Sequence, residues 1–372
     1  MEALEASSAS GRGGGIMKFI HTGDVHWGMT PDADKPWGKE RAQAIRDTFK
    51  AIIDHAGAVK ADCLFISGDL FHRQPLMRDI KEVNYLFSTI PHVRVVMIAG
   101  NHDKIRENSS ILSFSWSPNV TFLADPALSS VYFDDINTEV YGFSYHTTEI
   151  REPLLEDIQV PLNNRIQILL AHGGDPAHVP MNFNTLSLSP FSYIALGHIH
   201  KAQVIAEDKM AYCGSPEPLD LRETGTHGYF EGEIHPVTRR LTRLDFIPAA
   251  SLRCIPLAVT VTTETTNGGL TDRIINEIDK RGREHIYRFR LKGMRDPDIT
   301  FDLSSLSARF RIGEIIDESE PLYDFPALFA EHSSDMIGFF IQALQKEDIS
   351  PVEKKALYYG VNALLHTTDE RS

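Results

Sequence analysis

The chain has 372 residues and a formal net charge of −14, with 42% hydrophobic and 24% charged residues. This length suits one large domain with a sizeable core and a smaller second domain. The acidic balance excludes a broadly basic nucleic-acid coat, although it leaves room for a local positive site formed by bound metal ions. The sequence has no run of about 18 apolar residues, so no transmembrane helix is expected.

Two features bear on the cellular setting. The cysteines Cys63, Cys213 and Cys254 are widely spaced and form neither a disulfide framework nor a zinc pattern, which favours a reducing cytoplasm. Residues 1–16 are small and polar and lack the apolar segment of a signal peptide. We therefore expect them to be a flexible extension, native or added, that precedes the fold.

Strands and helices alternate at the start of the chain. Residues 18–22, 63–66 and 93–99 are short apolar runs typical of buried strands. Apolar residues recur at helical spacing over 39–60 and again over 80–90. This alternation predicts a parallel βαβαβ start and therefore an α/β fold.

Further short segments predict that the sheet becomes partly antiparallel. They are rich in β-branched and aromatic residues, which favour strands. They span 120–122, 130–133, 140–143, 165–171, 191–196, 203–206, 210–213 and 228–234.

Polar side chains gather where the predicted strands end, which is where open α/β sheets place their ligands. Each motif alone is also typical of an ordinary turn or a structural histidine, and His178 is expected at the surface. Together they supply seven nitrogen and oxygen ligands without a thiolate, which suits a pair of Mn²⁺, Fe or Zn²⁺ ions better than a structural zinc site. These residues are Asp24, His26, Asp69, Asn101, His172, His198 and His200.

The order Asp-x-His, Gly-Asp, Gly-Asn-His-Asp, His-Gly and Gly-His-x-His resembles the calcineurin-like metallophosphoesterase superfamily over about residues 17–235. The resemblance implies a β-sandwich flanked by helices and two divalent metal ions, with Mn²⁺ favoured over Fe, Zn²⁺ and Mg²⁺. It also implies a division of the ligands, with Asp24, His26 and His200 on one ion, Asn101, His172 and His198 on the other, and Asp69 between them.

Two details resemble the SbcD-type DNA-repair nucleases and their YhaO-like subgroup. His72 follows Gly-Asp-Leu-Phe, and Gly214-Ser215-Pro216 follows the last ligand pair. The resemblance implies a catalytic His102 beside the scissile phosphate, with His72 assisting it; alternatively, His72 only orients a ligand. It also implies exonuclease activity, with single-strand endonuclease activity in addition, in a double-strand-break repair complex.

The same resemblance implies DNA and an SbcC-like, SMC-type ATPase as partners, and a homodimer of the nuclease domains. The chain has no Gly-x-x-x-x-Gly-Lys-Ser/Thr loop, so ATP hydrolysis is expected to belong to the partner. The predicted domains are a nuclease domain at 17–248, a small α+β capping domain at 249–320 and a helical tail at 321–372. The tail is expected to dock on the ATPase, although apolar helices at a chain end also pack on their own domain.

Two further functions stay open at this point: a metallophosphoesterase for small substrates, and a non-catalytic scaffold for DNA ends. Basic residues flank the motifs and are expected either to form a cationic rim for a phosphate backbone or to be ordinary surface charge. They are Arg73, Arg78, Lys104, Arg106, Lys201 and Arg222.

Overall fold

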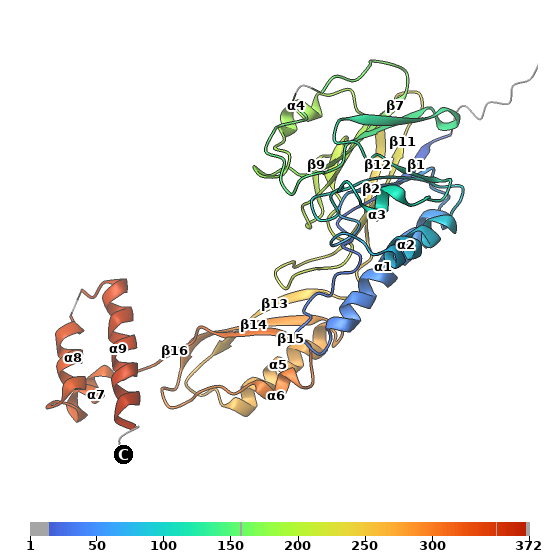
Figure 1. Ribbon diagram of the computed structural model, residues 1–372. Helices are drawn as coiled ribbons and strands as arrows, with labels where there is room; N and C mark the ends of the chain where they lie inside the picture. The colour runs from blue at the N-terminus through green and yellow to red at the C-terminus, as the bar shows by residue number, and fades with distance from the viewer. Residues whose placement is uncertain (1–14, 157, 347, 370–372) are drawn as a thin grey trace, which may run out of the picture. The chain divides into compact units, whose positions relative to one another are not determined.

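The computed structural model describes residues 15–156, 158–346 and 348–369. These residues form two compact units, with the division after Cys254. Figure 1 labels their helices and strands. Of the extension predicted for residues 1–16, all but residues 15 and 16 lie outside the described part of the chain.

The first sheet is built from the strand–helix alternation at the start of the chain. Its strands β1 to β4 are parallel, and β11 and β12 extend it in antiparallel fashion beside β1. The helices α1 (Gly38–Ala58) and α2 (Met77–Ser88) connect the first three strands and pack their apolar stripes on one face of the sheet. The spatial order is β12 (Leu241–Pro248), β11 (Gly228–Ile234), β1 (Met17–Thr22), β2 (Cys63–Ser67), β3 (Arg94–Ile98) and β4 (Val120–Phe122).

The second sheet has parallel strands in its interior and an antiparallel strand at each edge. Short helices α3 (Ser110–Ser113) and α4 (Phe183–Ser187) and the 3-10 turn η1 (Asp134–Ile136) lie in the connections of this unit. The spatial order is β5 (Ser129–Phe133), β6 (Thr138–Gly142), β7 (Ile166–His172), β8 (Tyr193–Gly197), β10 (Met210–Tyr212) and β9 (Gln203–Ala206).

The two sheets pack face to face, which explains why residues 63–66 of β2 are all apolar. Cys63 and Phe65 lie in the cluster between the sheets, while Leu64 and Ile66 lie in the cluster under the helices. Successive side chains of a strand point to opposite faces, so a strand covered on both sides needs apolar residues at every position. The β-sandwich that the resemblance implied is confirmed, whereas strand β12 was not predicted.

The second unit contains a small α+β layer and a group of helices. Strands β13 (Cys254–Val261), β14 (Ile286–Arg295) and β15 (Ile312–Asp317) form a sheet, and β16 (Glu320–Pro321) pairs with β14. Helix α6 (Ser304–Ser307) precedes β15 in the chain.

Helix α5 (Asn267–Arg281) buries a stripe of Leu270, Ile274 and Ile278 in the core of the α+β layer. The helices α7 (Phe325–Glu331), α8 (Met336–Leu344) and α9 (Pro351–Asp369) share an apolar cluster of their own. None of the described helices is both long and apolar enough to cross a membrane. The capping role and the partner-binding role stay predictions.

Candidate metal centre

The predicted ligands lie at the carboxyl ends of parallel strands from both sheets. Asp24 and His26 follow β1, Asp69 follows β2 and Asn101 follows β3, while His172 ends β7 and His198 and His200 follow β8. Contacts across the sandwich bring the two groups together. The Nδ1 of His172 donates to the carbonyl oxygen of Ser67 at 2.9 Å, and the amide of His198 donates to both carboxylate oxygens of Asp24 at 3.0 and 2.9 Å.

The loops after β1 and β2 are held against each other by their backbones. The amide of Asp24 donates to the carbonyl of Gly68, and the amide of His26 donates to the carbonyl of Asp69, both at 3.0 Å. Asp24, His26 and Asp69 have φ values of +48°, +51° and +48°, and His198 has +94°. Left-handed backbone is uncommon outside glycine and costs energy, so four such residues in one group indicate a functional site.

Asp69 occupies the middle of the group and is buried. Its Oδ1 accepts from the amide of His102 at 2.9 Å, and its Oδ2 lies 3.4 Å from Nε2 of His172 and 3.6 Å from Nε2 of His26. Burial raises the pKa of this carboxyl, but the neighbouring histidines outweigh burial and hold the pKa of Asp69 well below its usual range. Asp69 is therefore an anion that both sheets contact.

The ligand atoms of Asp24, His26 and His200 lie within 4.8 Å of one another, as do those of Asp24, Asp69 and His172. Burial raises the pKa of Asp24 to about 6 and lowers the pKa of His26 well below its usual value. The His26 ring is thus neutral and keeps a lone pair for a cation.

Asn101, His172 and His198 also meet. The Oδ1 of Asn101 lies 3.0 Å from Nε2 of His172, and the rings of His172 and His198 have centroids 5.1 Å apart. Burial lowers the pKa of His198 to about 4, so this ring is neutral as well. Both predicted ligand sets are therefore assembled by the fold.

The donor set fits divalent cations, and three observations test this. Because Nδ1 of His172 donates to the carbonyl of Ser67, its Nε2 faces oxygens of Asn101 and Asp69, where a cation would take the place of the proton that these groups hold on the ring. The Nε2 of His26 is buried without a hydrogen-bond partner among the described residues. A Cβ on Gly100 would lie 2.3 Å from Oδ1 of Asp69 and 2.7 Å from Nε2 of His172. Because residue 100 is a glycine, space remains beside these oxygen and nitrogen atoms. Their converging lone pairs require a positive charge between them.

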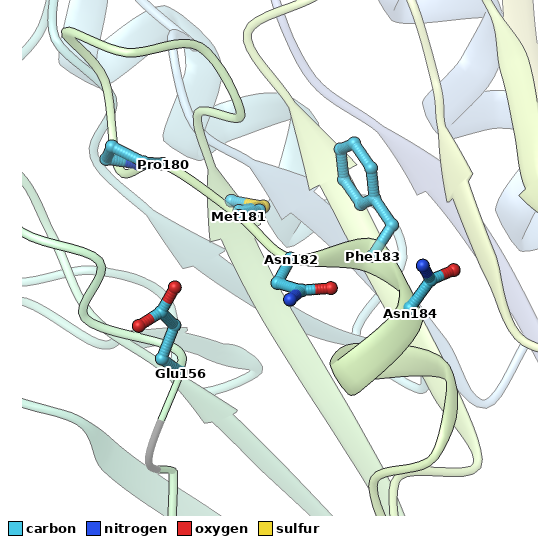
Figure 2. Close-up of a pocket in the computed structure, with 6 residues that line it drawn as sticks. All are labelled: Glu156, Pro180, Met181, Asn182, Phe183 and Asn184. Atoms are coloured by element: carbon cyan, nitrogen blue, oxygen red, sulfur yellow. The ribbon is translucent and has the colours of Figure 1, made fainter.

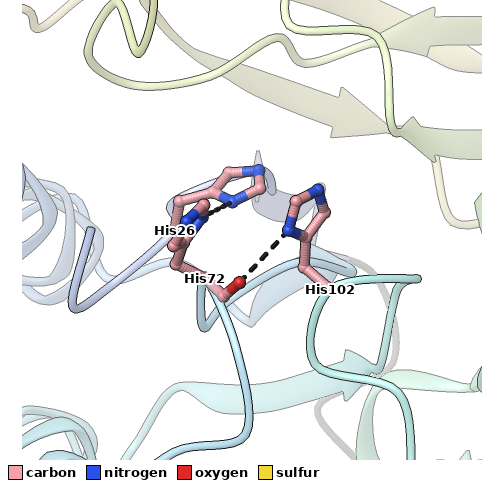
Figure 3. Close-up of side chains that lie close together, drawn as sticks. All are labelled: His26, His72 and His102. Atoms are coloured by element: carbon pink, nitrogen blue, oxygen red, sulfur yellow. Dashed lines mark hydrogen bonds between the residues drawn. The ribbon is translucent and has the colours of Figure 1, made fainter. Parts of the chain in front are cut away.

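The two predicted catalytic histidines lie beside this group. Figure 3 shows His72 and His102 next to His26, with Nδ1 of His72 at 3.1 Å from Nδ1 of His26. The Nδ1 of His102 donates to the carbonyl of His72 at 3.1 Å, its Nε2 has no hydrogen-bond partner among the described residues, and the side chain is exposed. Burial, together with His102 and Arg73, lowers the pKa of His72. Both rings are thus placed at the outer edge of the candidate centre.

Two carboxylates at the site were not singled out from the sequence, and His178 was expected elsewhere. Asp175 contacts His198, with Nε2 to Oδ2 at 2.7 Å, and Glu223 contacts His200, with Nδ1 to Oε1 at 2.6 Å. His178 was expected at the surface, yet it is partly buried, and its ring centroid lies 4.4 Å from that of His198. Each carboxylate is 23 residues from its histidine, so no local motif reveals the pairing.

A hollow of about 430 Å³ lies elsewhere in the first unit, and Figure 2 shows the six residues that line it. None of them is a predicted ligand or catalytic residue. They are Glu156, Pro180, Met181, Asn182, Phe183 and Asn184.

Comparison with known proteins identifies the family of the chain. The profile of the calcineurin-like phosphoesterase family matches residues 17–202, half of the chain. The chain is 28% identical over 342 residues to the DNA double-strand break repair protein Mre11 of Archaeoglobus fulgidus, covering 80% of this chain and 73% of that protein. It is 28% identical to Mre11 of Methanocaldococcus jannaschii, covering 56% of this chain and only 58% of that protein.

A third relative is the SbcD component of the nuclease SbcCD of Staphylococcus epidermidis, which is 24% identical with 74% of this chain and 79% of that protein covered. An uncharacterized metallophosphoesterase, YhaO of Bacillus subtilis, is 25% identical, with 58% and 56% covered. The chain therefore belongs to the calcineurin-like phosphoesterase family, whose hydrolases use a dinuclear metal centre.

Proposed function

We propose that the protein is a two-metal DNA nuclease of the SbcD type that hydrolyses phosphodiester bonds. The observation that carries the proposal is the assembly of all seven predicted ligands at one edge of the sandwich, with the buried anion Asp69 in contact with both sheets. The fold family makes the protein a metal-dependent phosphoesterase, and the DNA substrate is the proposed refinement.

The proposed ligand division follows the groups that the fold brings together. Asp24, His26 and His200 would hold one ion, and Asn101, His172 and His198 the other, with Asp69 shared. Divalent cations at such a centre neutralise charge on a phosphate and lower the pKa of bound water. Nitrogen and oxygen donors of this kind suit Mn²⁺, which we propose as the physiological metal.

His102 is proposed to act on the substrate directly. Its ring is exposed and its Nδ1 is tied to the carbonyl of His72, so the free Nε2 is available to a phosphate oxygen or a leaving group. A histidine in this position could donate a proton to the leaving oxygen or stabilise negative charge in the transition state. His72 contacts His26 as well as His102, so it would support both the ligand and the catalytic ring.

A DNA substrate is supported by the relatives and by charge near the site. Two of the relatives are DNA double-strand break repair proteins and a third is part of a nuclease. Of the six basic residues expected at the rim, Arg78 and Arg222 have carboxylate neighbours, Asp79 and Asp220. Within the described part of the chain, no ion pair engages the other four, which are Arg73, Lys104, Arg106 and Lys201.

For the second unit we propose a role in binding rather than in chemistry. The α+β layer is proposed as a cap that selects how DNA enters. Helices α8 and α9 present exposed apolar side chains, Met336, Phe339, Val352 and Tyr359, for an SMC-like ATPase partner. A homodimer of the nuclease domains stays a prediction.

The test is cleavage of end-labelled duplex DNA in Mn²⁺, Mg²⁺ or EDTA. We expect degradation in Mn²⁺, none in EDTA, and a loss of at least about 100-fold in Asp69→Asn, because the shared anion would be neutralised. The matched control is Asp47→Asn, an exposed carboxylate on α1 that should leave cleavage unchanged.

The outcomes separate the proposal from its rivals. DNA that stays intact in every metal, with and without the ATPase, while a small chromogenic diester is hydrolysed, would identify a small-substrate phosphoesterase. Binding of DNA ends without hydrolysis of any ester would identify a scaffold.

A further inference from the structure

We propose that Asp175 and Glu223 are positioning residues that fix the two histidines of the Gly-His-x-His motif in opposite orientations. His198 would then bind its ion through Nδ1, and His200 would bind its ion through Nε2. This inference rests on the proposed metal centre and adds two carboxylates that no ligand motif contains.

Asp175 is anchored by backbone amides and holds a histidine ring. Its Oδ1 accepts from the amides of Ala177 at 2.7 Å and His178 at 3.1 Å. Its Oδ2 accepts from Nε2 of His198 at 2.7 Å and from Nδ1 of His178 at 2.9 Å. Since Nε2 of His198 donates to a carboxylate, Nδ1 is the nitrogen left with a lone pair.

Glu223 is also anchored by a backbone amide and also holds a histidine ring, although it lies in a different segment of the chain. Its Oε2 accepts from the amide of Leu219 at 2.7 Å and lies 3.5 Å from Oγ of Ser215. Its Oε1 accepts from Nδ1 of His200 at 2.6 Å, which leaves Nε2 of that ring with the lone pair.

The Gly214-Ser215 turn connects Glu223 to the backbone of the motif. The amide of Ser215 donates to the carbonyl of His200 at 2.9 Å. Gly214 has φ +72°, and a Cβ there would lie 2.6 Å from the amide nitrogen of Ala202 and 2.8 Å from the carbonyl oxygen of His200. The turn can lie this close to the backbone of His200 and Ala202 only with glycine at position 214. The Gly-Ser pair after the ligands therefore positions Glu223 beside His200.

In both cases one oxygen of the carboxylate is fixed by a backbone amide and the other oxygen holds an imidazole. Backbone amides cannot rotate away, so each carboxylate sets both the tautomer and the orientation of its histidine. Removing such an outer carboxylate from a metal-binding histidine typically weakens metal affinity 10–100-fold. We expect a loss of about that size for either carboxylate.

The experiment measures Mn²⁺ affinity by calorimetry and metal content by mass spectrometry for the full chain and for Asp175→Asn, Glu223→Gln and Glu223→Ala. The matched control is Glu231→Gln. The Oε2 of Glu231 pairs with Nε2 of His55 at 2.8 Å, so this control removes a histidine–carboxylate bond of similar length that involves no predicted ligand. We expect weaker binding in the three test variants and unchanged binding in the control.

A crystal structure of the wild-type protein with Mn²⁺ gives a second readout that does not depend on any variant. Contact through Nδ1 of His198 and Nε2 of His200 would support the inference, and the reverse pair of nitrogens would overturn it. Test variants that bind Mn²⁺ as tightly as Glu231→Gln would also overturn it. A wild-type protein that binds no Mn²⁺ would instead remove the proposed function on which the inference rests.

Discussion

The two sheets contribute different chemistry to the same site. The strand ends of the first sheet supply oxygens from Asp24, Asp69 and Asn101 and the histidines His26, His72 and His102, whereas those of the second sheet supply imidazoles alone, from His172, His198 and His200. The first-sheet loops are held by backbone hydrogen bonds, and the second-sheet rings are held by hydrogen bonds from their side chains. Neither layer has a complete donor set, so the site depends on the packing of the sandwich.

Gly100→Ala tests the contact between the two sheets and should have the broadest effect, on both activity and stability. The added Cβ would crowd both Oδ1 of Asp69 and Nε2 of His172. We expect metal-dependent activity to fall at least about 100-fold, since displacements near 1 Å have that effect, with about 1–3 kcal/mol lost from the free energy of unfolding. Diester hydrolysis and urea melts measure the two effects.

The control for this substitution is Gly268→Ala, because a Cβ at Gly268 meets nothing within 4 Å. Full activity in Gly100→Ala would show that the two sheets do not need to approach so closely.

His102→Asn and His172→Asn distinguish residues that affect the catalytic rate from residues that affect metal binding. His102 is exposed and stands outside both predicted ligand sets, so its loss should lower kcat by about 10²–10⁴-fold and leave Mn²⁺ affinity unchanged. His172→Asn should lower the affinity itself. Calorimetry with single-turnover kinetics distinguishes the two. Weakened Mn²⁺ binding in His102→Asn would assign that residue to the metal rather than to the substrate.

The stability of the metal-free protein should fall as the pH rises from about 6.5 to 9. Burial disfavours the charged ring, yet the carboxylates of Asp69 and Asp24 raise the pKa of His172 to about 9. A histidine whose pKa is higher in the folded state than in the unfolded state stabilises the fold, and the full effect is present below the unfolded-state pKa of 6.5. The effect is lost as the pH rises toward the folded-state pKa of about 9. The slope is at most about 1.4 kcal/mol per pH unit.

Urea melts across this pH range, with and without Mn²⁺, measure the effect. Mn²⁺ should abolish the decline, because metal affinity rises as ligands lose protons. Metal-free stability that is flat or rising over the same window would show that the carboxylates of the first sheet do not hold a proton on His172.

Tyr193→Phe tests the link between the sheets away from the metal and should have the smallest effect. Its hydroxyl bonds Nδ1 of the buried His21 at 2.8 Å, which connects β8 to β1. Leaving that nitrogen without a partner should cost about 1–3 kcal/mol of unfolding free energy without changing Mn²⁺ affinity. Tyr132→Phe serves as the control, because Tyr132 is exposed and its hydroxyl bonds only the nearby side chains of Asp134 and Asn137 among the described residues. A change in Mn²⁺ affinity would mean that this core contact shapes the site.

The positions of the ligands along the chain follow from local sequence. Asp24, Asp69, Asn101 and His172 each stand at the end of a short apolar run, and such runs become strands because their β-branched and apolar side chains are stable only in a covered sheet. Parallel strands bring their carboxyl ends to one edge, so the spacing of the motifs was enough to predict a shared site.

The way in which the ligands are divided and held follows from tertiary packing. The separation into two sheets, the added strand β12 and the contacts of Asp175 and Glu223 all depend on packing between segments far apart in sequence. A carboxylate 23 residues from its histidine leaves no local pattern, because its position is set by the turn that carries it. Local sequence thus specified the donors, and the sandwich set their geometry.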